Sequence, residues 1–279
     1  MKPAPFEYAC PASLSEAVRL LASRPDAKAL AGGQSLMPVL AFRLAEPSLV
    51  VDLRKLPGLA GIEATPAGIR LGALVRWRDI ERAENLPHPL LKAAVAHVAH
   101  YQIRNRGTIG GSLAHADPAA ELPGVAVACE GVIEIAGSKG ARKVAADQFF
   151  TGPLSTVLAQ DELVTGLVLP AWPAARCWGF EEFARRRGDF AIAGIAAYYD
   201  LENGRALGAH IGVIGACARP HRLPEAEAAL NGRVVDEAAI LAAARAAAVD
   251  PPDDLHASAA YRRALVETLI ERALRRAAA

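Results

Sequence analysis

Residues 104–123 read RNRGTIGGSLAHADPAAELP, and residues 30–38 read LAGGQSLMP. Each stretch holds a Gly-Gly pair with a serine one or two residues further on. Glycine lets the backbone approach a ligand closely and reach conformations that other residues avoid. Consecutive amides in such turns form concave clusters of donors for anionic oxygens. Two such turns in one chain therefore suit an extended ligand with a diphosphate in its middle.

The side chains beside the two glycine pairs support the same interpretation. In the first stretch, the amides of residues 32–34 and the hydroxyl of Ser35 can line a diphosphate. In the second, the hydroxyls of Thr108 and Ser112 flank the glycines. The simpler alternative is that each pair only makes a tight turn. Neither stretch fits G-x-G-x-x-G or G-x-x-x-x-G-K-[ST], which disfavours a Rossmann or P-loop site.

The composition is that of an ordinary globular protein with one large domain or two to three smaller ones. The chain has 279 residues, 52% of them hydrophobic, and a formal net charge of +1. That charge gives no overall attraction for nucleic acid or a membrane surface. The four cysteines lie far apart without a C-x-x-C pair, which disfavours an iron–sulfur cluster in this chain. No stretch reaches membrane-spanning length, so we expect a cytoplasmic protein.

Local patterns predict alternating helices and strands as far as the PAWPAA break at residues 170–175. Beyond the break, residues 176–220 predict strands around a turn and a short helix, and the alanine-rich segment that follows predicts helices. The elements expected before the break are a helix at 11–25 capped by Ser13 or Ser15, strands at 27–33 and 48–57, a hairpin at 61–77, a helix at 89–103, a hairpin at 131–150 and a strand at 161–170.

Four motifs together resemble the FAD-binding medium subunits of the molybdenum hydroxylases, a family that includes aerobic carbon monoxide dehydrogenase and the xanthine dehydrogenases. They are AGGQSLMP (31–38), QIRNRGTIGGSLAHADPAAELP (102–123), FFTGPLSTVLAQDELVTGLVLP (149–170) and RRRGDFAIAG (185–194). The resemblance implies an α+β chain with a two-subdomain FAD-binding fold of the vanillyl-alcohol-oxidase/p-cresol-methylhydroxylase type. The implied domains are FAD-binding subdomain 1 at 1–55, FAD-binding subdomain 2 at 56–172 and a small C-terminal α+β domain at 173–279.

The resemblance also implies where FAD is held, with no catalytic residue and no metal ligand in this chain. Residues 30–37 would follow the diphosphate and ribityl chain, with residues 108–112 on the other side. Glu121 matches an acidic position that hydrogen-bonds cofactor hydroxyls, and Leu163 an apolar position against the flavin or adenine. The implied cofactor contacts are Leu30, Ala31, Gly32, Gly33, Gln34, Ser35, Leu36, Met37, Val98, Thr108, Ile109, Gly110, Gly111, Ser112, Ala116, Asp117, Glu121, Leu163, Asp189 and Phe190.

Two positions depart from the family pattern. Phe190 stands beside the implied isoalloxazine position where some relatives have tyrosine, so it keeps the stacking surface without the hydroxyl. Glu181 stands where xanthine dehydrogenases have a lysine, and it cannot supply that positive charge. The Arg185–Arg187 run faces a partner, the cofactor or solvent.

Other charged residues near the second stretch leave alternatives open. Arg104 and Arg106 either steady the phosphates or form ion pairs with acidic side chains nearby, Asp117 and Glu121. His115 and Asp117 form an H-x-D pair, but no second close histidine or cysteine completes a metal site, so no metal ion is expected.

The resemblance implies an oxidoreductase subunit that passes electrons from the [2Fe–2S] clusters of a small partner subunit through FAD to an external acceptor, a quinone, NAD or oxygen. A large partner subunit would carry the molybdenum cofactor, in a dimer of heterotrimers. The scattered cysteines agree with clusters on another chain. The alternatives are a stand-alone FAD-dependent oxidase or reductase of the same flavin fold, and an interaction protein that has lost FAD.

Overall fold

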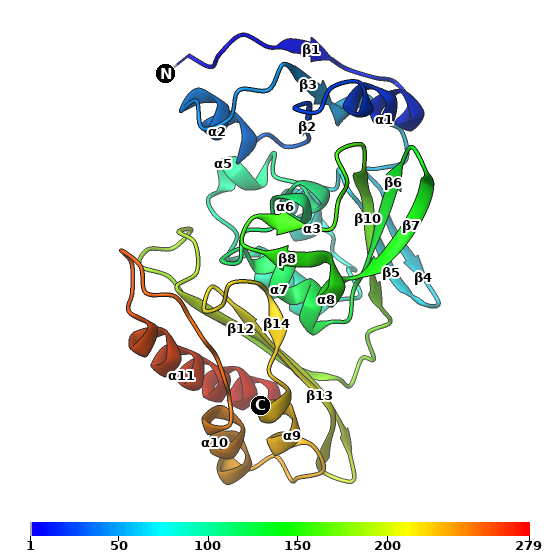
Figure 1. The fold of residues 1–279 in the computed structure, drawn as a ribbon. Helices are drawn as coiled ribbons and strands as arrows, with labels where there is room; N and C mark the ends of the chain where they lie inside the picture. Colours follow the sequence, from blue (N-terminus) through cyan, green and yellow to red (C-terminus); the bar gives the residue numbers. More distant parts are fainter. Residues whose placement is uncertain (1) are drawn as a thin grey trace.

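The computed structural model describes residues 2–279, which form three units that follow one another along the molecule (Figure 1). Each unit is built on its own sheet, with strand orders β1-β3-β2, β4-β5-β10-β6-β7 and β11-β12-β13-β14. A short two-stranded sheet of β8 (Phe150–Gly152) and β9 (Ser155–Thr156) accompanies the second unit. This mixture of helices and sheets is the expected α+β class.

The first unit is a small parallel sheet between two helices. Its elements are β1 (Glu7–Ala9), α1 (Leu14–Ala22), β2 (Lys28–Leu30), α2 (Leu36–Ala41), β3 (Leu49–Asp52) and the 3-10 turn η1 (Leu53–Lys55). The Ser13 side chain caps α1, as one of the two alternatives predicted. Successive strand residues point to opposite faces of a sheet. Val51 therefore packs in the core with α1, whereas Val50 faces the loop after β2.

The second unit is a five-stranded antiparallel sheet covered by short helices. Its strands are β4 (Ile62–Thr65), β5 (Gly68–Gly72), β6 (Val132–Gly137), β7 (Gly140–Ala145) and β10 (Leu163–Pro170). Its helices are α3 (Trp77–Arg82), α4 (Pro89–Val95), α5 (Tyr101–Arg104), α6 (Ile109–His115), α7 (Glu121–Ala128) and α8 (Ala146–Phe149). Both predicted hairpins are confirmed, because β4 pairs with β5 and β6 pairs with β7.

The third unit packs three helices on a four-stranded antiparallel sheet. Its elements are β11 (Cys177–Phe183), β12 (Ala193–Glu202), β13 (Arg205–Ile214), β14 (His221–Arg222), α9 (Pro224–Leu230), α10 (Glu237–Arg245) and α11 (Ala259–Ala278). Helix α11 lies so close to β11 that a Cβ on Gly179 would be 2.0 Å from the carbonyl oxygen of Ala273. The close approach therefore depends on the missing side chain.

Helix α7 joins the second and third units. Every residue from Glu121 to Ala128 is buried, and a Cβ on Gly124 would lie 2.3 Å from Cγ1 of Ile214 in β13. A helix buried on all sides belongs to the interior of a protein. The core of the second unit accordingly continues onto Phe180, Tyr198 and other residues of the third sheet.

Three expected elements differ from the structure. The short helix expected within residues 176–220 is absent, because the described chain forms only strands and turns between β11 and β14. The helix expected at 89–103 ends at Val95 and the chain turns at Ala99, whose φ is +41°, before α5 begins. The second glycine pair, expected in a turn, lies in the first turn of α6, where Thr108 caps the helix by accepting from the Gly111 amide. Within residues 2–279, no helix combines the length and apolar character needed to cross a bilayer.

Candidate cofactor-binding site

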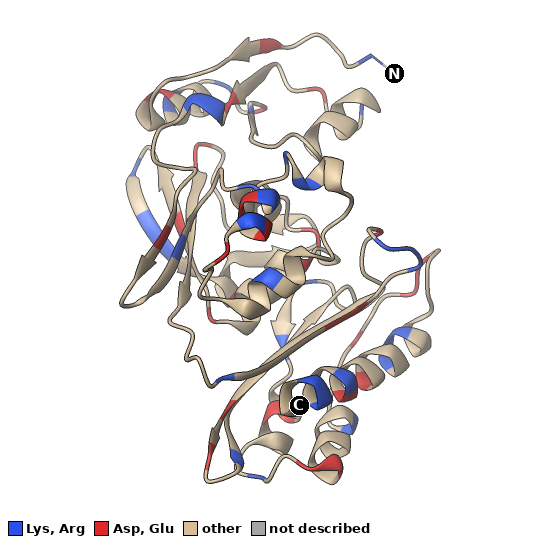
Figure 2. Cartoon of the chain, turned by 180° about the vertical axis from the view of Figure 1, so that it is seen from behind, with Lys and Arg blue, Asp and Glu red and all other residues tan. Residues whose placement is uncertain are grey.

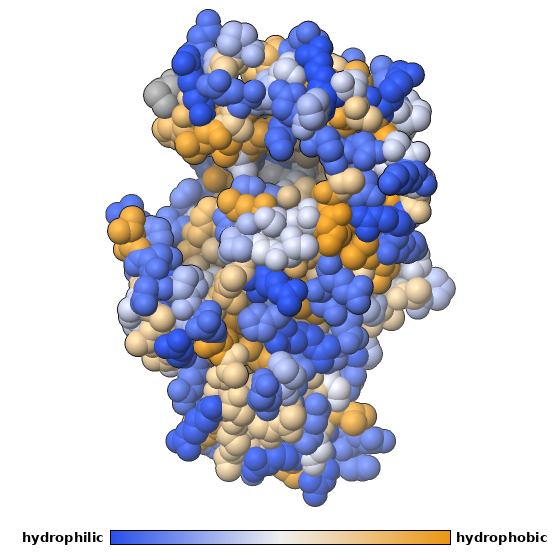
Figure 3. Space-filling view, viewed as in Figure 1, coloured by the Kyte–Doolittle hydropathy of each residue, from blue (hydrophilic) through white to orange (hydrophobic). Residues whose placement is uncertain are grey.

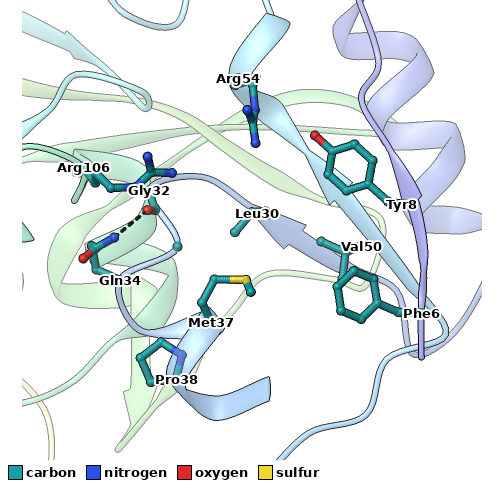
Figure 4. A pocket seen from close by; sticks show the side chains of 11 residues that line it. Phe6, Tyr8, Leu30, Gly32, Gln34, Met37, Pro38, Val50, Arg54 and Arg106 are labelled. Carbon is teal, nitrogen blue, oxygen red and sulfur yellow. Dashed lines mark hydrogen bonds between the residues drawn. The ribbon is translucent and has the colours of Figure 1, made fainter. Parts of the chain in front are cut away.

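A cavity of about 430 Å³ opens where the first unit meets the second. The space-filling view shows the surface hollowed between these two units (Figure 3). Three parts of the first unit line the cavity: the loop after β2, the start of α2, and strands β1 and β3. Arg106 lines it from the second unit, and its side chain lies beside Gly32 (Figure 4).

The structure brings the two glycine stretches together. A Cβ on Gly32 would lie 2.2 Å from the carbonyl oxygen of Arg106, and a Cβ on Gly111 would lie 3.8 Å from the Cβ of Ala31. Gly33 has a φ of +74°, a conformation that side-chain-bearing residues rarely adopt. The loop after β2 therefore needs glycine both for its turn and for its contact with the second unit.

The loop after β2 offers a run of free backbone donors. The amides of residues 32–35 donate to no acceptor within residues 2–279. The Gln34 side chain donates to the carbonyl of Gly32 at 3.0 Å, which holds the loop in place (Figure 4). Successive unpaired amides on a loop of this kind form a binding site for anionic oxygens.

The second glycine pair contributes space rather than donors, contrary to expectation. The Gly110 amide donates to Ala73 O at 2.8 Å, and the Gly111 amide donates to Thr108 Oγ1 at 3.2 Å. A Cβ on Gly110 would also lie 2.5 Å from the Cβ of Ala73, so this glycine serves packing. Gly111 faces the first stretch, and it is the member of the pair that leaves room for a ligand.

The charge in the cavity comes mainly from Arg106. Arg54 pairs with Asp52 and Arg104 with Glu81, whereas Arg106 has no such partner within residues 2–279. Although burial opposes ionisation of Asp52, hydrogen bonds from Arg54 hold its pKa below the ordinary value, so Arg54 is largely neutralised. Arg106 is thus a free cation next to the free amides, which suits a phosphate group.

A second cavity, of about 280 Å³, lies where the second unit meets the third. It is lined by Ala96 and His97 after α4, and by Glu182, Ala184 and residues 186–188 around the turn between β11 and β12. Figure 2 shows this turn, with its basic run, projecting from the third sheet. The Glu182 side chain is 4% exposed, and its Oε2 atom has no hydrogen-bond partner within residues 2–279.

The other expected contacts lie in several surroundings. The first cavity is lined by Leu30, Gly32, Gly33, Gln34 and Met37. Ala31 and Ser35 belong to the loop after β2, and Leu36 begins α2. Ile109, Ala116, Val98 and Leu163 are buried in cores, Leu163 in that of the first unit. Ser112 and Asp117 are half-buried, and Asp189 and the exposed Phe190 lie on the turn beside the second cavity.

Two charged residues have partners other than those considered from the sequence. Arg104 donates to the carbonyls of Val98 and Ala99 at 2.9 and 2.8 Å and pairs with Glu81 rather than with Asp117 or Glu121. Glu181 pairs with Arg276 of α11 at 3.1 Å, on the face of β11 away from the second cavity. Glu182, the next residue along the strand, faces the cavity and was missed.

Sequence reasoning also missed one wall of the first cavity. This wall consists of Phe6, Tyr8, Val50 and Arg54, because parallel pairing places β3 beside β2 and β1 on the other side of β3. The Tyr8 hydroxyl donates to Asp52 at 2.9 Å, which fixes the ring. The only local signal was the strand predicted at 48–57, and a single predicted strand does not reveal its neighbours in a sheet.

Two buried carboxyl groups, those of Glu121 and Glu182, influence each other's charge. Burial raises the pKa of Glu121 to about 7 and that of Glu182 to about 8, and the charge of Glu121 adds to the second shift. A carboxyl with a raised pKa in the folded state stabilises the fold below its unfolded pKa, and this contribution is lost as pH rises through the folded pKa.

We expect the flavin-free chain to lose roughly 1–2 kcal/mol of unfolding free energy between about pH 6.5 and about pH 8. Urea unfolding at several pH values measures this change. The Glu182→Gln variant should show a smaller loss over the same range. An equal loss in both proteins would show that Glu182 does not hold a proton in the folded chain.

The sequence matches two family models over nearly its whole length. Residues 4–172 match the FAD binding domain in molybdopterin dehydrogenase, and residues 178–277 match the CO dehydrogenase flavoprotein C-terminal domain. The chain is 42% identical to the nicotine 6-hydroxylase medium subunit of Paenarthrobacter nicotinovorans over 98% of each sequence. It is 34% identical to the carbon monoxide dehydrogenase medium chain of Hydrogenophaga pseudoflava, covering 98% of this chain and 97% of the relative.

Solved structures agree with these matches. Quinoline 2-oxidoreductase from Pseudomonas putida 86 superimposes with a TM-score of 0.95 at 38% identity, covering 100% of this chain and 99% of the other. Carbon monoxide dehydrogenase from Hydrogenophaga pseudoflava gives 0.96 at 36% identity, covering 99% and 98%. Fold and site thus define an FAD-binding oxidoreductase subunit. The chain belongs to the FAD-binding medium subunits of the molybdenum hydroxylase family.

The residues present fit FAD. The free amides of residues 32–35 and the unpaired guanidinium of Arg106 match a diphosphate in charge and in hydrogen bonding. The bare Cα of Gly111 leaves space beside them, and the buried Glu121 carboxyl lies at the start of α7. An extended nucleotide can therefore be held between the first and second units.

Proposed function

We propose that this chain is the electron-transfer subunit of a molybdenum hydroxylase. It would receive electrons from [2Fe–2S] clusters in a small partner subunit and deliver them to an external acceptor, a quinone, NAD or oxygen. A large partner subunit would carry the molybdenum cofactor and oxidise the substrate. The observation that carries this proposal is the loop of unpaired amides beside Arg106, placed against the second glycine stretch.

In this proposal the protein supplies binding and orientation, and bound FAD supplies the redox chemistry. Residues 30–37 and Arg106 would hold the diphosphate, and Gly111 would leave room for the chain that follows it. Glu121 would accept hydrogen bonds from cofactor hydroxyls. Val98, Leu163, Asp189 and Phe190 would form the surroundings of the ring systems, and Thr108, Ile109, Gly110, Ser112, Ala116 and Asp117 would frame the cofactor along α6.

The names of the relatives support a multi-subunit assembly. One is a 6-hydroxypseudooxynicotine dehydrogenase complex subunit alpha, 41% identical to this chain, and others are medium subunits or medium chains. Within residues 2–279, no three His, Cys, Asp or Glu side chains form a group that could hold a metal ion. The proposal places the iron–sulfur clusters in the small partner subunit, in a cytoplasmic dimer of heterotrimers.

We also propose a division of labour among the three units. Residues 1–55 and 56–172 would be the two FAD-binding subdomains, because the first cavity lies between them. Residues 173–279 would form the C-terminal domain, which closes the second cavity with Glu182 and the turn that follows β11.

Co-purification tests the proposal. The chain is expressed with and without the genes that neighbour its own, and each product is examined by visible spectroscopy and metal analysis. We expect a yellow chain that co-purifies with iron- and molybdenum-containing subunits, and turnover only in the complex. Nicotine, quinoline and carbon monoxide, taken from the relatives' names, form the first substrate panel. A yellow chain that is fully active alone would instead indicate a stand-alone oxidase or reductase.

A further inference from the structure

The Glu182 carboxyl stands out among the buried polar groups of the described chain. It lies on β11 and lines the second cavity, its side chain is 4% exposed, and Oε2 has no hydrogen-bond partner within residues 2–279. Nearly all buried polar atoms in proteins are hydrogen-bonded. A buried carboxyl oxygen that faces a cavity without a partner therefore indicates that the cavity receives a polar ligand.

Within residues 2–279, no cation forms a close ion pair with this carboxyl. His97 Nδ1 is 4.0 Å from Oε1, outside hydrogen-bond distance, and burial lowers the pKa of His97, which favours its uncharged form. Arg186 and Arg187 line the same cavity but form no ion pair with Glu182. The remaining charged neighbour is Glu121 of α7, which repels a negative charge on Glu182. Glu182 is thus held protonated, and a protonated carboxyl can donate a hydrogen bond as well as accept one.

Glu182 lies close to several residues that are proposed to contact the cofactor. The turn bearing Asp189 and Phe190 adjoins the second cavity, Val98 follows His97 in the chain, and the charge of Glu121 acts on Glu182. All four are proposed cofactor contacts. We place the diphosphate of FAD in the first cavity, and the cofactor then runs past Gly111 to Glu121. The end of the cofactor that reaches Glu182 is the one opposite the adenosine. In FAD that end is the flavin ring, whose polar edge carries two carbonyl oxygens on either side of an N–H group.

We propose that Glu182, in its protonated form, donates a hydrogen bond to a carbonyl oxygen on the polar edge of the flavin and so positions the ring in the second cavity. This inference rests on the proposed function, because it requires FAD to bind in the groove. It adds a contact that the Glu121 position does not provide, since Glu121 is assigned to the cofactor hydroxyls.

The test separates the two ends of the cofactor. The full-length chain, freed of flavin, is titrated with FAD by fluorescence and with ADP by calorimetry, because ADP occupies only the diphosphate end. In Glu182→Leu, which keeps the bulk but removes the donor, we expect FAD to bind about tenfold more weakly and ADP to bind as in the native chain. Glu182→Gln retains an N–H donor and should bind FAD within about twofold of the native chain.

Matched controls keep the test decisive. Glu181→Gln alters the neighbouring residue, which faces Arg276, and should leave both affinities unchanged. Thermal melting verifies that each variant is folded, and Glu182→Ala replaces the leucine variant if that one does not fold. Equal FAD affinity in Glu182→Leu and native protein would overturn the inference, and so would an equal loss of FAD and ADP binding. A native chain that binds neither FAD nor ADP would instead overturn the proposed function.

Discussion

A Gly111→Val variant is expected to fold but to purify with less than about a tenth of the native FAD content. A Cβ at Gly111 would lie 2.9 Å from Thr108 Oγ1 and 3.8 Å from the Cβ of Ala31, so the fold itself tolerates it at the cost of a weakened helix cap, about 1 kcal/mol. The two methyl groups of valine would then fill the space between the glycine stretches that a cofactor backbone needs. Visible absorbance of the purified chain, with circular dichroism as the measure of folding, provides the readout.

Two other glycines serve as comparisons for this variant. Gly152→Val places its Cβ where no atom lies within 4 Å, and it should retain FAD and stability. Gly110→Val places its Cβ 2.5 Å from that of Ala73, and it should lower the melting temperature even without cofactor. Full FAD content in folded Gly111→Val would show that the cofactor does not pass between the two stretches.

A Gly179→Val variant is expected to destabilise the fold by about 3 kcal/mol or more. Its Cβ would lie 2.0 Å from the carbonyl oxygen of Ala273, and a backbone atom of a long helix cannot move aside as a flexible side chain can. Helix α11 would have to move away from β11, which opens the core that both elements cover. Urea unfolding followed by circular dichroism measures the loss.

The Gly152→Val protein is again the appropriate control, because it introduces the same side chain at a strand glycine with free space. An unchanged unfolding midpoint in Gly179→Val would contradict the close packing of α11 on β11. Reduced FAD content in a variant of full stability would also contradict it, since Gly179 lies outside the proposed cofactor contacts.

Local signals were sufficient for the elements that depend on local chemistry. Ser13 followed by an amphipathic run predicted α1, and the glycines of the 131–150 segment predicted the turn between β6 and β7. Gly110 and Gly111 gave a turn prediction because glycine disfavours helices. In the structure, packing of Gly110 against Ala73 outweighs that preference. Tertiary contact, which no local pattern encodes, decided this segment.

The part of the site that could be predicted is the part formed by consecutive residues. The amides of residues 32–34 were anticipated as a donor cluster, and the structure leaves the amides of residues 32–35 free. Tyr8 and Arg54 join the cavity only through parallel strand pairing, and Glu182 faces the second cavity only because β11 lies beside α4 and the residues that follow it. Residues that reach a site through sheet order or layer packing give no signal in a single sequence.

The burial of α7 on every side has a consequence for how the molecule can move. This helix packs against both the second and the third unit. Close contacts such as that of Gly124 with Ile214 prevent the two units from sliding past each other. The second cavity is lined by residues of both units, so its walls are held at a fixed separation. Relative motion between units is therefore confined to the interface between the first and second units. We expect the segment from β4 to α11 to unfold in one cooperative transition. Entry of the cofactor would instead depend on motion at the interface between the first and second units.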